Sequence, residues 1–114
     1  MLAFAEGLLL ADRDGVDPKI ALDVMTQSPI GSPMLKARAP LVLDLPEDAW
    51  FDIGLMHKDI QLALGMAAEL EVQLPSAEVA DTVLAGAEGL GYGRRDLAAL
   101  FQVLERWNDG ASEA

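Results

Sequence analysis

Proline and glycine joints divide this chain into short segments whose apolar residues recur at helical spacing. The last segment shows this pattern most clearly. Its apolar positions, which follow the i, i+3, i+4, i+7 rule of an amphipathic helix, are Leu97, Leu100, Phe101, Leu104 and Trp107. Alanine and leucine far outnumber valine, isoleucine and threonine, and sheets select the β-branched types. The sequence therefore predicts an all-α fold, a compact bundle of four to five helices around a long central helix.

The expected helices are bounded by caps, prolines and glycines. They span residues 2–13, 18–26, 51–72, 75–90 and 97–107, with one further short helix at 33–39. The helix at 51–72 is the longest and is apolar over most of its circumference, so we expect it to be the central one. The helix at 2–13 is apolar almost all round, which predicts burial on every side although it looks under-covered. Asp96 is expected to cap the last helix.

The run LVLDL, between two prolines, could be read as a short buried strand. A strand there would have no ladder partner anywhere in the chain, so we expect residues 40–48 to be coil. The length of 114 residues predicts one domain, placed at 1–107, with residues 108–114 as a disordered tail.

Charge and composition exclude several classes of function. A formal net charge of −11 makes a free-standing nucleic-acid binder improbable and disfavours anionic membranes. The sequence has no long uninterrupted apolar run and no basic amino-terminal region, which indicates a cytoplasmic chain without a membrane segment. The absence of cysteine excludes disulfides and thiolate metal sites.

One stripe of the expected central helix carries residues that do not suit a core. At 100° per residue, the stripe consists of Phe51, Gly54, Lys58, Gln61 and Gly65. It could face a ligand, with Lys58 offering a positive charge to an anionic group and Phe51 a flat apolar surface. Alternatively, Lys58 reaches past a neighbouring helix that the glycines admit. The pattern alone leaves both interpretations open.

Other candidate side chains suggest ordinary structural roles. Asp52 and Asp59 are seven residues apart and could form an acid/base pair or a metal site. Acidic side chains at the start of a helix more often interact favourably with the positive end of the helix dipole, so we expect no metal site. His57 is the single histidine and is expected to be a surface or interface side chain. The glycines of residues 89–93 follow a helix rather than a strand, so we interpret them as a helix stop and not as a phosphate loop.

Residues 58–65 (KDIQLALG), with Phe51 seven residues before Lys58, resemble the KDLGxAxD motif of the β-hydroxyacid dehydrogenases. This is the family of 3-hydroxyisobutyrate dehydrogenase. Further similarities occur in the same order as in that family, at residues 2–18, 74–75 and 89–100. The chain departs from the motif at two positions, with Gln61 in place of glycine and Gly65 in place of aspartate.

The resemblance implies an all-helical C-terminal domain like those of 6-phosphogluconate dehydrogenase-like enzymes, with residues 1–13 as the end of an interdomain helix. It implies a separate N-terminal Rossmann domain, NAD or NADP as cofactor, and a small hydroxy acid or its semialdehyde as substrate. By the same resemblance, Lys58 matches the cofactor-side lysine, Phe51 an aromatic residue that lines the cleft, and Asp59 the partner of Lys58 in the motif.

The motif that carries the catalytic lysine in this family, GxxGxGxxxKxxxN, has no match in these residues. We therefore expect no catalytic residue here and no activity from the chain alone. An alternative from another class is a stand-alone helical dimerisation or interaction module without catalysis, which the apolar first helix favours. Both hypotheses predict a homo-oligomer.

Overall fold

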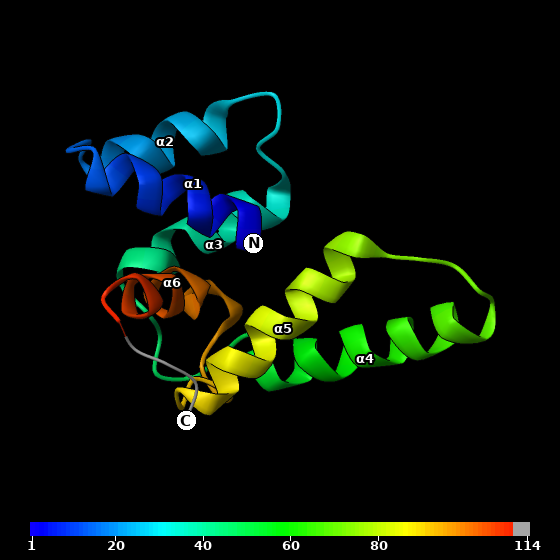
Figure 1. Cartoon of the computed structure of the whole chain (residues 1–114). Helices are drawn as coiled ribbons and strands as arrows, with labels where there is room; N and C mark the ends of the chain where they lie inside the picture. Colours follow the sequence, from blue (N-terminus) through cyan, green and yellow to red (C-terminus); the bar gives the residue numbers. More distant parts are fainter. Residues whose placement is uncertain (111–114) are drawn as a thin grey trace. The chain divides into compact units, whose positions relative to one another are not determined.

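The computed structural model describes residues 1–110, in which it contains six α-helices, one 3₁₀ turn and no strand (Figure 1). The elements are α1 (Leu2–Arg13), α2 (Pro18–Gln27), α3 (Pro33–Leu43), α4 (Ile53–Glu69), α5 (Pro75–Gly89), η1 (Leu97–Ala99) and α6 (Leu100–Asn108). The predicted all-α fold class is confirmed. Asn108 ends α6, and the rest of the expected tail, from 111 to 114, lies outside the described residues. No helix within residues 1–110 has the length and apolar character needed to cross a membrane.

Local caps explain why α2 and α4 begin where they do. The carboxylate of Asp17 accepts the amide of Lys19 at 2.9 Å, directly before α2. Asp52 does the same for α4 by accepting the amide of Leu55 at 2.7 Å, so this helix starts after position 51. Its other end lies before Glu71, whose φ of 56° is left-handed. The helix is therefore shorter at both ends than the predicted span of 51–72.

The third helix continues through Pro40 to Leu43, so the expected coil at 40–48 is wrong over its first residues. Proline has no amide hydrogen to donate to the carbonyl of Lys36, four residues earlier. Beyond the proline, the Val42 side chain is 1% exposed. Burial of this apolar residue favours continuing the helix despite the missing hydrogen bond.

The described residues form two compact units. The first joins Met1–Glu47 to the described residues from Ala98 onward, and in it α1 packs on α2 and α6 while α2 packs on α3. Its core lies on one face of α1, which buries Phe4, Ala5, Leu8 and Leu9. Within the described residues this helix is under-covered, as expected, because Leu10 is 74% exposed. The single domain expected over 1–107 stays a prediction.

The second unit, Asp48–Leu97, is built on a hairpin of α4 and α5, drawn in green and yellow in Figure 1. The buried residues of α4 are Ile53 and Ala67, which leaves most of its apolar surface open. Leu62, Met66 and Leu70 are each 64% exposed. The prediction that α4 is the longest helix is confirmed, but the burial expected of a central helix is not observed, because α5 covers one face.

Candidate functional site

The first turn of α4 is hydrogen-bonded to the glycine turn that follows α5. The amide of Ile53 donates to the carbonyl of Arg95 at 3.0 Å, and the amide of Gly54 donates to the carbonyl of Gly93 at 2.8 Å. A Cβ at Gly54 would lie 3.1 Å from that Gly93 oxygen. The backbone of this turn therefore approaches Gly54 closely. At Gly65, nothing among the described residues lies within 4 Å of such a Cβ, so that end of the stripe is open.

Phe51 is held through both of its backbone polar groups. Its amide donates to Oδ1 of Asp96 at 3.2 Å, and its carbonyl accepts the amide of Leu97 at 3.0 Å. The same Asp96 oxygen accepts the amide of Trp50 at 3.0 Å. The segment just before α4 is thus tied to the segment just after the glycine turn, and an antiparallel bridge between Asp52 and Asp96 lies at their crossing.

The last helical segment begins directly after Asp96, as expected, with the η1 turn leading into α6. The N-cap of α6 is Ala99, which makes no side-chain cap hydrogen bond, and the η1 turn precedes it. Sequence reasoning missed the long-range role of Asp96, because an acid before a helical pattern indicates only a local cap. Its Oδ1 accepts hydrogen bonds from backbone amides 45 and 46 positions earlier in the chain, and no local pattern reveals such contacts.

The candidate cofactor residues lie on or next to this anchored turn. Lys58 and Asp59 are on the second turn of α4, and both are exposed. Neither has an ion-pair partner within residues 1–110. Phe51 is half-buried and directly precedes the Asp52 cap. The cap role favours the dipole interpretation of Asp52, and within the described range no three acidic or histidine side chains are arranged to hold a metal ion.

His57 points to the other side of α4, against α5. Its Nε2 lies 3.0 Å from Oδ1 of Asp81, and its Nδ1 contacts Oε1 of Glu88. The imidazole is only 16% exposed. His57 therefore joins the two helices of the hairpin, and its expected role as a surface or interface side chain stays a prediction. Lys58, the next residue, is left facing solvent.

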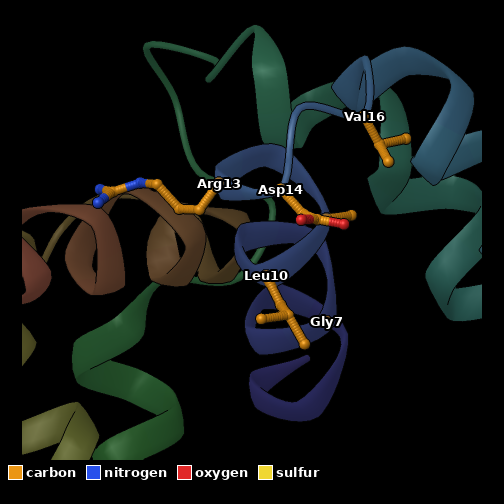
Figure 2. A pocket seen from close by; sticks show the side chains of 6 residues that line it. Gly7, Leu10, Arg13, Asp14 and Val16 are labelled. Atoms are coloured by element: carbon orange, nitrogen blue, oxygen red, sulfur yellow. The ribbon is translucent and has the colours of Figure 1, made fainter.

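A shallow apolar hollow lies on the first unit, beside the end of α1 (Figure 2). Figure 2 shows Leu10 and Val16 at this hollow, while the side chain of Arg13 extends away from them. The Arg13 guanidinium pairs with Asp109 at 3.1 Å. The hollow has few polar groups to orient a small molecule, and the anchored turn of α4 remains the better candidate for ligand chemistry.

Residues 1–104 match the family described as NAD-binding of NADP-dependent 3-hydroxyisobutyrate dehydrogenase. The chain is 30% identical over 105 residues to glyoxylate/succinic semialdehyde reductase 2, chloroplastic, of Arabidopsis thaliana. The aligned region covers 92% of this chain and 29% of that relative. It is 35% identical over 102 residues to the cytokine-like nuclear factor N-PAC of Aedes aegypti, covering 89% of this chain and 18% of that relative.

Among solved structures, the chain is similar to 3-hydroxyisobutyrate dehydrogenase from Salmonella typhimurium, with a TM-score of 0.81 and 30% sequence identity. That similarity covers 89% of this chain and 35% of the solved chain. This sequence therefore spans about a third or less of these relatives, and the remainder of each has no counterpart in it.

Proposed function

Because this chain belongs to the family of NADP-dependent 3-hydroxyisobutyrate dehydrogenase, we propose that it forms the helical cofactor-side part of an NAD(P)-dependent oxidoreductase. A Rossmann domain supplies most contacts to the cofactor in this proposal. The whole enzyme transfers a hydride between NAD(P) and a small hydroxy acid or its semialdehyde. The similarity to a semialdehyde reductase and to a solved hydroxyacid dehydrogenase supports this assignment.

The observation that carries the proposal is the exposed, unpaired ammonium of Lys58 on the helix that the anchored Phe51 precedes. A chain with a net charge of −11 repels an anionic dinucleotide, so a local cation is needed where the two meet. Lys58 supplies that charge, and the Phe51 ring supplies an apolar wall. Asp59 follows Lys58 on the same exposed turn and is the third residue of the proposed contact.

The proton-transfer step is assigned to the other domain. Reducing a carbonyl by hydride needs a general acid close to the substrate oxygen. No histidine in this chain is available for that role, because the single imidazole, that of His57, is held between Asp81 and Glu88. The proposal therefore predicts no turnover of semialdehydes by the 114-residue chain alone. Measurable NADPH-dependent reduction by the pure chain would contradict this division of labour.

The direct test is an NMR titration of the ¹⁵N-labelled chain with NADPH at millimolar concentration. We expect shifts to concentrate around Phe51 and Lys58, and Lys58→Ala to weaken binding about tenfold by removing a charge-assisted contact. Lys58→Arg, which keeps the charge, should retain most of the affinity. Lys19→Ala, which removes an exposed charge from α2, is the matched control. Unchanged NADPH affinity in Lys58→Ala would contradict the proposal.

A second candidate is a stand-alone helical dimerisation or interaction module without catalysis. Exposed apolar residues on both units, such as Leu10 and Leu62, support it. Light scattering after size-exclusion chromatography tests the self-association that both candidates predict. Self-association without any NADPH-induced shift would favour the second candidate, and a monomer that binds NADPH through Lys58 would favour the first.

A further inference from the structure

We propose that Asp96 is a positioning residue for Phe51, which it orients through the backbone amides of Trp50 and Phe51. The inference rests on the proposed function, in which the Phe51 ring forms a wall against the cofactor. Both amides donate to a single oxygen, Oδ1 of Asp96, at 3.0 and 3.2 Å. This carboxylate acts on the candidate site from the opposite end of the second unit's sequence.

Burial is the first reason to assign Asp96 this role. It is 0% exposed and is the buried charged residue of the described range. A buried carboxylate is costly unless hydrogen bonds compensate it, and an apolar residue of similar size would fill the same space without that cost. Bonds to a charged acceptor are shorter and stronger than neutral ones. The two amides of the segment before α4 are among the groups that compensate this buried carboxylate.

The second reason is where those two amides lie. Trp50 and Phe51 precede the N-cap Asp52, so α4 offers no intrahelical acceptor for their N–H groups. One shared oxygen fixes two consecutive peptide planes, and the amide of Leu97 fixes the Phe51 carbonyl. Three hydrogen bonds thus set the backbone from which the Phe51 ring projects.

The consequence for binding is pre-organisation. Phe51 lies outside regular secondary structure, so no helical hydrogen bond holds its backbone. Without the Asp96 carboxylate, the cofactor would have to order this segment as it binds, and that cost lowers affinity. Asp96 touches no cofactor in this scheme, and its whole effect passes through Phe51.

The test compares Asp96→Asn, Phe51→Ala and the double variant in the full chain. Asparagine keeps the shape and one acceptor oxygen while removing the charge, so the fold should persist where Asp96→Ala could unfold it. We expect hydrogen exchange at the Trp50 and Phe51 amides to accelerate about tenfold, with NADPH binding weakened severalfold. In the Phe51→Ala background, Asp96→Asn should change NADPH affinity less than about twofold, because the two residues act as one unit.

Asp17→Asn is the matched control, because it weakens an aspartate-held amide at the start of α2 in the first unit. It should leave exchange at Phe51 and NADPH affinity unchanged. Unaltered exchange at Trp50 and Phe51 in Asp96→Asn would overturn the inference, as would full additivity in the double variant. If Phe51→Ala itself binds NADPH like the parent chain, the proposed function fails, and with it the cofactor role of Asp96. The exchange result still decides whether Asp96 orients Phe51.

Discussion

Nε2 of His57 on α4 lies 3.0 Å from Oδ1 of Asp81 on α5. The other ring nitrogen contacts Glu88, which lies about two turns further along the same face of α5. The imidazole therefore links two points of α5 to α4. On α4, the fully buried apolar residues are Ile53 and Ala67. These contacts place the imidazole between the two helices of the hairpin.

Replacing this imidazole should destabilise the hairpin. We expect His57→Ala to lower the free energy of unfolding by about 1–2 kcal/mol, since it leaves the Asp81 carboxylate without its partner. Urea denaturation followed by circular dichroism measures this change. Lys58→Ala, next to it but exposed, should stay within about 0.5 kcal/mol of the parent chain. Equal losses in both variants would contradict a specific role for His57.

The two stripe glycines should respond differently to alanine. Nothing in the described chain lies near the position of a Cβ at Gly65, so Gly65→Ala should stabilise by about 0.5–1 kcal/mol through helix propensity alone. Gly54→Ala should gain less or lose, because its methyl group would press on the Gly93 carbonyl at 3.1 Å. Thermal unfolding of both variants decides this, and an equal gain from the two substitutions would contradict the close approach at Gly54.

Glu105 on α6 should make stability depend on pH in the acidic range. Burial raises the pKa of its carboxyl, and the nearby Asp12 carboxylate raises it further. A raised folded-state pKa means that the folded protein binds this proton more tightly than the unfolded chain. The resulting penalty is fully present above the folded pKa and disappears below the unfolded one.

Glu105→Gln should accordingly raise stability at neutral pH by less than about 1 kcal/mol, because the side chain is only partly buried and solvent screens its charge. The advantage over the parent chain should vanish as the pH falls below the range in which glutamate titrates. Chemical denaturation at a series of pH values measures the difference. An advantage that grows toward acidic pH would show that the sign is wrong.

Proline inside α3 should cost stability that alanine recovers. Pro40→Ala restores an amide donor for the Lys36 carbonyl and removes a steric conflict, although it loosens the unfolded chain. We expect a net gain of about 1–2 kcal/mol in the free energy of unfolding. A loss would show that the proline geometry is needed to bring Val42 into the core. Equilibrium unfolding in urea measures either outcome.

Local signals predicted much of the secondary structure. Asp17 and Pro18 mark the start of α2, and the periodic apolar residues of α6 mark its buried face. Such features act over a few residues, so they can be recognised without knowing the fold. The family motif around Lys58 was recognisable for the same reason, because its residues are contiguous in the chain.

Three features depended on residues far apart in sequence. Val42 is buried beyond a proline, Asp96 holds the amides of Trp50 and Phe51, and α4 remains largely exposed although it is apolar. Each of these features depends on how distant segments pack together in the folded chain. Burial or a buried hydrogen bond can then override the local conformational preference.

The sequence by itself therefore determined the helical class, most helix ends and the family. The tertiary structure decided the setting of the candidate site, in which Phe51 is held by Asp96 and Leu97 while His57 turns to α5. The physical reason is that caps and periodicity are short-range, whereas the hydrogen bonds that orient this site join segments brought together only by folding.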